Sequence, residues 1–129
     1  MKKTEDQGER PSSSATTWAA MTHLSSFGGW VLPWLGQVVF PLIVWGLGRK
    51  RDPFVDDQGL EASNFGVTMA IVDAGSWIFF FATLGRSMNV YAVILLVLAV
   101  AFQSLFVIIA AIMAKGGKRY RYPICLRLL

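Results

Sequence analysis

Charged residues are scarce in this 129-residue sequence and absent from most of its length. They make up 16% of the chain, against roughly 25% in an ordinary soluble domain. None lies in residues 18–48 or 87–114, and Asp73 is the only one in residues 62–85. Uncharged stretches of this length exclude a soluble globular domain and predict an integral membrane protein.

Cysteine and histidine are almost missing as well. Cys125 is the only cysteine, which excludes an internal disulfide and a cysteine-rich metal site. His23 is the only histidine and has no second ligand nearby in the sequence. We expect it to hydrogen-bond an adjacent helix, with pH sensing as the alternative. Because no nucleophile is paired with a general base, we expect no enzymatic activity, no cofactor and no metal.

The excess of basic residues, a formal net charge of +4, does not indicate nucleic-acid binding. Most of the lysines and arginines flank apolar segments, where such residues set topology and contact anionic lipid. The expected partners are therefore a lipid bilayer with anionic lipids and no nucleic acid. A homo-oligomer or another membrane protein is a further possible partner.

The hydropathy pattern predicts an all-α membrane protein with polar ends. Residues 1–16 are too polar to bury a core and are expected to be a disordered tail. Helices are expected at about 60–84 and 90–114, each about one membrane thickness long. The loop 49–60 is charged, and residues 115–129 are expected to form a basic aromatic tail at the membrane interface.

The first apolar stretch, residues 17–48, has two interpretations. A single helix over it would be about 48 Å long at about 1.5 Å per residue, against a hydrocarbon core of roughly 30 Å. Pro33 and Gly36 interrupt the stretch, because proline disfavours helix at the residue before it. The stretch is therefore either one kinked span, giving three spans in all, or a hairpin of two short helices at about 17–31 and 35–48.

The distribution of lysine and arginine predicts the orientation. The 49–60 loop holds three of them, residues 115–129 hold five, and the 85–89 turn holds one. By the positive-inside rule, the 49–60 loop and the C-terminus are cytoplasmic. The N-terminus lies outside for a single first span and inside for a hairpin. The expected location is the bacterial cytoplasmic, or inner, membrane.

Four groups of residues carry a resemblance to a known family. They are Trp18-Ala19-Ala20 with His23-Leu24-Ser25, then Pro33-Trp34-Leu35-Gly36 with Pro41-Leu42-Ile43-Val44-Trp45, then Asp52-Pro53-Phe54-Val55-Asp56-Asp57-Gln58-Gly59 with Glu61-Ala62-Ser63-Asn64-Phe65, and Arg121-Tyr122-Pro123 with Leu126-Arg127-Leu128. Over residues 17–129 the chain resembles small bacterial membrane proteins of unknown function that are related to the chloroplast import component Tic-twenty. The resemblance implies a four-helix membrane domain with both termini inside, which favours the hairpin. It also implies a link to protein transport.

Asp73 is the most unusual side chain, because it lies at the middle of the predicted 60–84 helix. An ionised carboxylate in hydrocarbon is costly, so we expect it to be protonated or paired. Gln103 and Ser104 lie at the same depth of the next span and are its expected partners, with Ser76 one turn away. The alternative is a role in proton or cation movement.

Polar groups also gather at the start of that helix, at Asp56, Asp57, Gln58, Glu61 and Asn64. Carboxylates suit a helix N-terminus, where the dipole favours negative charge. We expect these acids to cap the helix and to pair with the basic residues of the adjoining loop. A partner-binding surface is the alternative, and a metal site is not expected.

Cations and tyrosines at the membrane-flanking positions predict an interfacial anchor, with tyrosines at the headgroups and cations on lipid phosphate. The set comprises Arg49, Lys50, Arg51, Lys115, Lys118, Arg119, Tyr120, Arg121 and Tyr122. Taken together, the sequence predicts a structural, interaction or assembly subunit in the membrane. The alternative is a small oligomeric channel or transporter that uses Asp73.

Overall fold

The computed structural model describes residues 9–129, and this part of the chain is all helical, without strands. It contains α1 (Ser13–Leu24), the 3₁₀ helix η1 (Ser25–Trp30), α2 (Gly36–Gly48), α3 (Pro53–Ala82) and α4 (Asn89–Lys115). The prediction of four helices is therefore confirmed. Two of them, α3 and α4, are long and apolar enough to cross a membrane.

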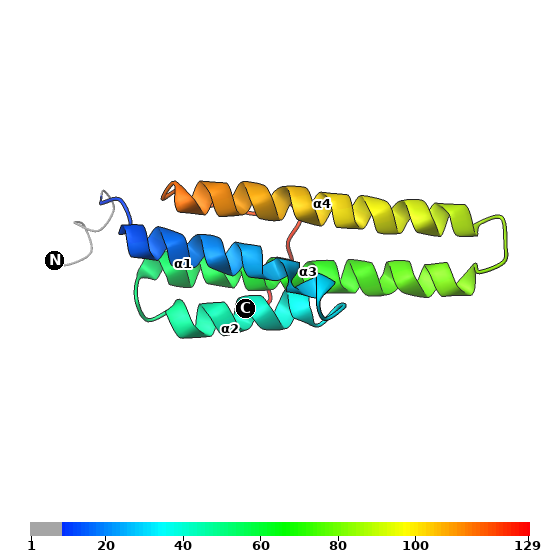
Figure 1. Ribbon diagram of the computed structural model, residues 1–129, viewed down its shortest axis with the longest axis horizontal. Helices are drawn as coiled ribbons and strands as arrows, with labels where there is room; N and C mark the ends of the chain where they lie inside the picture. The colour runs from blue at the N-terminus through cyan, green and yellow to red at the C-terminus, as the bar shows by residue number, and fades with distance from the viewer. Residues whose placement is uncertain (1–8) are drawn as a thin grey trace.

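The helices are of unequal length, and this sets the shape of the molecule (Figure 1). α3 and α4 run side by side along its whole length, joined by the loop 83–88 at one end, which we call the far end. α1 and α2 lie beside only the other half, at the end that carries the loop 49–52 and the C-terminus of α4. We call this the charged end. The turn between η1 and α2 lies about halfway along α3 and α4 (Figure 1).

The chain reverses direction at residues 31–35, so the hairpin interpretation of residues 17–48 applies and the kinked single span does not. The amide of Gly36 donates to the carbonyl of Leu32 at 2.7 Å, and Trp34 has a positive φ of 64°. A Cβ on Gly36 would lie 2.0 Å from the carbonyl oxygen of Gly28. Glycine is therefore required where α2 leaves the turn, because a side chain would collide with η1.

Two helices begin earlier than the hydropathy pattern predicts. α3 begins at Pro53 rather than at residue 60, because Asp52 accepts a hydrogen bond from the amide of Phe54 at 2.7 Å and proline suits the first helical position. α1 begins at Ser13, where Ser12 accepts from the amide of Ala15 at 3.1 Å. The end of the expected disordered tail is thus helical, and residues 1–8 lie outside the described residues.

α4 buries small side chains and exposes large apolar ones, as helices in a membrane do. Its buried positions are mostly alanine, such as Ala99 and Ala110, whereas large aliphatic side chains such as Val97, Leu98 and Ile112 are more than half exposed. A helix in a soluble protein buries its large apolar side chains instead. Small residues between helices and large ones facing outward are what close packing in lipid requires.

Candidate functional site

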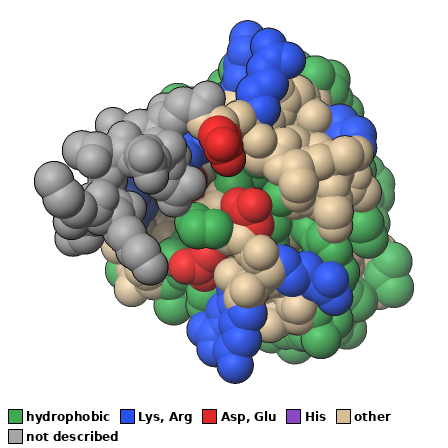
Figure 2. All heavy atoms as spheres, turned by 90° about the vertical axis from the view of Figure 1, so that its left-hand side faces the viewer, with side chains coloured by type: hydrophobic (Ala, Val, Ile, Leu, Met, Phe, Trp, Pro, Cys, Tyr) green, Lys and Arg blue, Asp and Glu red, His purple; other side chains and the backbone are tan. Residues whose placement is uncertain are grey.

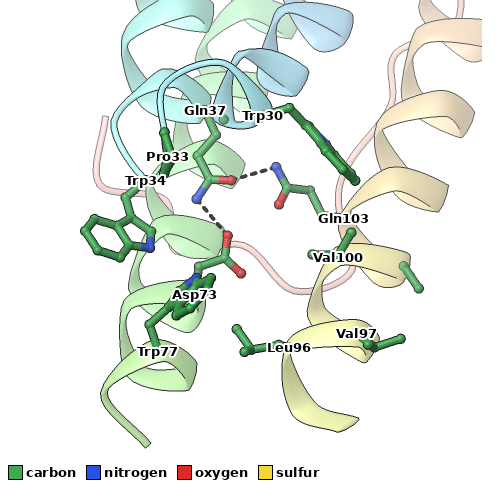
Figure 3. A pocket seen from close by; sticks show the side chains of 12 residues that line it. Trp30, Pro33, Trp34, Gln37, Asp73, Trp77, Leu96, Val97, Val100 and Gln103 are labelled. Carbon is green, nitrogen blue, oxygen red and sulfur yellow. Dashed lines mark hydrogen bonds between the residues drawn. The ribbon is translucent and has the colours of Figure 1, made fainter. Parts of the chain in front are cut away.

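Asp73 forms the end of a hydrogen-bonded chain that joins three helices (Figure 3). Gln103 of α4 donates from Nε2 to Oε1 of Gln37 at 2.7 Å, and Gln37 of α2 donates from Nε2 to Oδ2 of Asp73 at 3.0 Å. The expected direct partners were Gln103 and Ser104. Gln103 instead reaches Asp73 only through Gln37, and Ser76 donates to the backbone carbonyl of Val72.

Gln37 reaches Asp73 because α2 and α3 approach closely near Gly66. A Cβ on Gly66 would lie 2.0 Å from the carbonyl oxygen of Gln37, so only glycine permits this contact. The Gln37 side chain is 2% exposed. Gln37 was not predicted from the sequence. A single polar amide in an apolar segment could have indicated a buried hydrogen bond to a neighbouring helix, and Gly66 could have indicated where that helix approaches closely.

A cavity of about 550 Å³ lies beside Asp73, at the point where the hairpin ends and α3 and α4 continue alone (Figure 3). Its lining residues are Gly29, Trp30, Pro33, Trp34, Gln37, Asp73, Trp77, Leu96, Val97, Val100, Ala101 and Gln103. Oδ1 of Asp73 is buried and has no hydrogen-bond partner. The cavity therefore has mainly apolar walls, and an unpaired polar atom is buried beside it.

A second polar site lies on α3, nearer the charged end, and holds the C-terminal tail. Gln58, Glu61, Asn64 and Thr68 follow one another at helical spacing and are all buried. Their side-chain oxygens accept hydrogen bonds from backbone amides of the tail, at distances of 2.8–3.0 Å. The amides are those of Tyr120, Tyr122, Leu126, Leu128 and Leu129. We call these four side chains the tail cradle.

Ion pairs close the tail onto the same helix. Arg121 pairs with Asp57 and, at 3.3 Å, with Glu61, and Arg127 pairs with Glu61 at 3.2 Å. The hydrogen bond to Asp57 is the main cause that raises the pKa of Arg121 above its ordinary value. The acidic residues of α3 were expected to pair with the loop cations instead.

The loop cations have other contacts, so the expected pairing across the loop does not occur. The guanidinium of Arg49 lies 5.0 Å from the ring centre of Trp45, and that of Arg51 lies 4.7 Å from the ring centre of Trp18. Asp56 accepts a hydrogen bond from the indole of Trp45 at 2.8 Å. These contacts fix the tryptophans at the charged end, because a cation over an indole face is favourable.

Tyr122 is part of the core and not of the interface, which corrects its assignment as a lipid anchor. It is 2% exposed and stacks on Phe65 with ring centres 3.8 Å apart. Burial raises the pKa of the Tyr122 phenol well above its ordinary value, so the phenol keeps its proton. It lies 3.0 Å from Nδ1 of His23, whose Nε2 lies 3.3 Å from Oε1 of Gln58. A neutral His23 that accepts at Nδ1 and donates at Nε2 satisfies both contacts.

The other predicted anchor cations lie at the surface of the charged end. Arg49, Lys50, Arg51, Lys115, Lys118, Arg119 and Arg121 are all exposed. Figure 2 views this end and shows basic side chains around a centre that contains acidic ones. No group of three or more possible metal ligands occurs among the described residues.

Comparison with known families corrects the family relationship that the motifs suggested. The family model MamF_MmsF, the magnetosome magnetite crystal formation protein family, matches residues 14–129. The chain belongs to this family. The predicted kinship with the Tic-twenty-related family is therefore wrong, and the link to protein transport that depended on it is withdrawn. No curated protein and no solved structure matches the chain.

The matched region contains the hairpin, the Asp73 cavity, the tail cradle and the tail itself. The motifs that suggested the Tic-twenty relationship all lie within the residues matched by the MamF_MmsF model. A membrane protein is consistent both with this family and with the two long apolar helices.

Proposed function

We propose that this MamF_MmsF protein is a membrane-embedded structural or assembly subunit of the magnetosome, and that it acts in magnetite crystal formation without catalysing a reaction. The observation that carries the proposal is the family match over residues 14–129. The arrangement of the charged end supports an interaction role, because the interior polar groups there hold a peptide segment in place.

The tail cradle gives the charged end a fixed surface. An extended segment of this kind would lose its shape in solution, since ordering each residue costs about 1–2 kcal/mol of backbone entropy. Five amide contacts and the ion pairs of Glu61 offset part of that cost. A surface ordered in advance binds a partner with less loss of entropy. Anionic lipid headgroups, a second copy of the chain or another membrane protein are the partners that this end suits.

The far end offers much less for recognition. The loop 83–88 contains Arg86 as its only charged residue and has no carboxylate. Hard metal ions prefer carboxylate and carbonyl oxygens, so this loop is poorly suited to hold iron at a mineral surface. The positive-inside rule predicts that the charged end is cytoplasmic and that the far end lies on the opposite side of the membrane. The protein then acts on crystal formation through what it assembles in the membrane.

Gene deletion and complementation in a magnetite-forming bacterium test this proposal. Crystal size and number per cell are measured by electron microscopy after deletion, and after complementation with the wild-type chain, Glu61→Ala or the control Asp57→Asn. We expect altered crystals in the deletion strain, rescue by wild type and Asp57→Asn, and poor rescue by Glu61→Ala despite normal amounts in the membrane. Normal crystals in the deletion strain would contradict the proposal.

A second candidate is ion movement through an oligomer, favoured by the unpaired Oδ1 of Asp73 beside an open cavity. Proteoliposomes containing the full chain are tested for proton and cation flux, with Asp73→Asn as the comparison. Flux that disappears in Asp73→Asn would support this function over the assembly role. Flux equal to that of empty liposomes would exclude it.

A further inference from the structure

The cavity beside Asp73 is positioned to receive a molecule from the bilayer. The hairpin of α1, η1 and α2 covers only half of the α3–α4 pair, and the cavity lies directly beyond its tip (Figures 1 and 3). A volume of about 550 Å³ falls within the range of about 300–1,000 Å³ that is typical of small-molecule sites.

The hydrogen bonds on the polar side of the cavity all run in one direction, toward Asp73. Gln103 donates to Gln37, and Gln37 donates to Oδ2 of Asp73, so the chain of donors ends at the carboxyl group. Oδ1, the other oxygen, is buried without a partner. A buried polar atom left unpaired costs about 1–3 kcal/mol, so a ligand that pairs with it is favoured.

The protonation state of Asp73 decides which ligand atom fits. Among the described residues, no lysine or arginine forms an ion pair with Asp73. In hydrocarbon an unpaired carboxylate is costly and the neutral acid is favoured. Oδ2 then serves as the carbonyl oxygen that accepts from Gln37, and Oδ1 carries the proton. A hydroxyl donor beside an apolar cavity calls for an acceptor such as a carbonyl oxygen. Because Oδ1 has almost no accessible surface, the carboxyl group must turn toward the cavity to make this bond.

The walls favour a flat body for this ligand. Indole rings of Trp30, Trp34 and Trp77 come from the hairpin and α3, and the aliphatic side chains of Leu96 and Val100 come from α4 (Figure 3). Aromatic faces stack favourably on other flat rings. We propose that the cavity binds a lipid-soluble quinone, with one ring carbonyl accepting a hydrogen bond from Asp73 and the ring lying among the indoles. This site does not depend on the function proposed above.

Tryptophan fluorescence provides the test, because quinones quench indole emission at short range. Three of the five tryptophans line the cavity, whereas Trp18 and Trp45 lie at the charged end. The full chain in phospholipid nanodiscs is titrated with decylubiquinone. We expect quenching that saturates, above the linear quenching expected from collisions in the bilayer.

Four variants separate binding at Asp73 from collision. Asp73→Leu removes the donor and should weaken saturable quenching about tenfold, the effect of one lost hydrogen bond to a buried group. Asp73→Asn keeps an oxygen for Gln37 and an N–H for the quinone, so it should bind like wild type. Val100→Phe should abolish binding by filling the cavity. Val93→Phe makes the same kind of change on α4 outside the lining and should have no effect.

Several results would overturn the proposal. Linear quenching in wild type, or equal quenching in Asp73→Leu and wild type, would exclude a bound quinone. Saturable quenching that is lost in Asp73→Asn would show that an amide N–H cannot replace the carboxyl group, which would contradict the assignment of Asp73 as a simple hydrogen-bond donor. Saturation that appears only after bound phospholipid is removed would make a lipid the natural occupant. Circular dichroism and elution volume in detergent verify that each variant folds, and Val100→Phe tests the site independently of Asp73.

Discussion

Replacing Glu61 should release the C-terminal tail from α3. The Glu61 side chain is 2% exposed and accepts from the amide of Tyr122 at 2.9 Å, while its oxygens also contact Arg121 and Arg127. In Glu61→Gln, one amide oxygen still serves Tyr122, but the charge is lost. Because the side chains of Arg121 and Arg127 are 49% and 56% exposed, water takes over part of their contacts. The expected cost to tail docking is about 1–2 kcal/mol.

The alanine variant should have a larger effect. Glu61→Ala also leaves the buried amide of Tyr122 without an acceptor, which adds about 1–3 kcal/mol. Each 1.4 kcal/mol changes a population tenfold. The undocked fraction should therefore rise roughly 5- to 30-fold in Glu61→Gln and roughly 30-fold to more than 1,000-fold in Glu61→Ala.

Trypsin cleavage measures the undocked fraction, because a peptide bond must leave the cradle before it can enter the protease. The tail contains cleavage sites after Arg121 and Arg127, and mass spectrometry of the chain in nanodiscs follows both. Asp57→Asn is the matched control on the same helix. It removes a partly exposed partner of Arg121, which is worth about 0–1 kcal/mol.

The reasoning would be refuted if Glu61→Ala were cut no faster than wild type, or if Asp57→Asn matched Glu61→Gln. The first result would mean that the tail contacts contribute little to its position. The second would mean that general charge, and not the buried geometry of Glu61, holds the tail. Equal helicity by circular dichroism verifies that the helices remain intact.

Three further predictions concern packing, orientation and reactivity. Gly66→Ala should destabilise the chain by about 1–3 kcal/mol or more on denaturant titration, because its Cβ would meet the α2 backbone at 2.0 Å, whereas Gly75→Ala has open space and should be neutral or stabilising by up to about 1 kcal/mol. In spheroplasts of a Cys125→Ser chain, a membrane-impermeant maleimide should label Ser87→Cys but not Lys118→Cys, and the reverse result would invert the orientation. Burial raises the pKa of the Cys125 thiol, so its labelling rate in detergent should keep rising at a pH where a free peptide thiol has reached its plateau; matching profiles would contradict this.

The helices could be predicted from the sequence because their signals are local. Uncharged stretches marked α3 and α4, and Pro33 with Gly36 marked the turn of the hairpin. The start of α3 at Pro53 was missed because the charges of residues 49–57 suggested a loop. The capping contact of Asp52 with Phe54 and the proline at the first helical position were the competing signals, and they prevail.

The tail could not be placed from the sequence, since its position depends on contacts between residues about 60 positions apart. Cations interleaved with tyrosines are typical of a membrane interface, and Tyr120 and Tyr122 match that pattern equally well. Their packing distinguishes them, because Tyr122 is buried against Phe65 in the core, whereas Tyr120 is only partly buried. Side-chain oxygens that accept hydrogen bonds from the backbone of an extended segment leave no periodic pattern in the sequence of that segment.

The hydrogen-bond partner of Asp73 could not be predicted from the depths of residues in the membrane alone. Matching the midpoints of two antiparallel helices predicted Gln103 at the level of Asp73, and both residues line the same cavity. Depth does not say what lies between two helices. A half-length hairpin ends at that level, and Gly66 lets its backbone approach α3 closely enough for Gln37 to fill the gap. The same short hairpin leaves the space beyond its tip open. The polar chain and the cavity therefore have one cause, which is a hairpin that stops halfway along the two long helices.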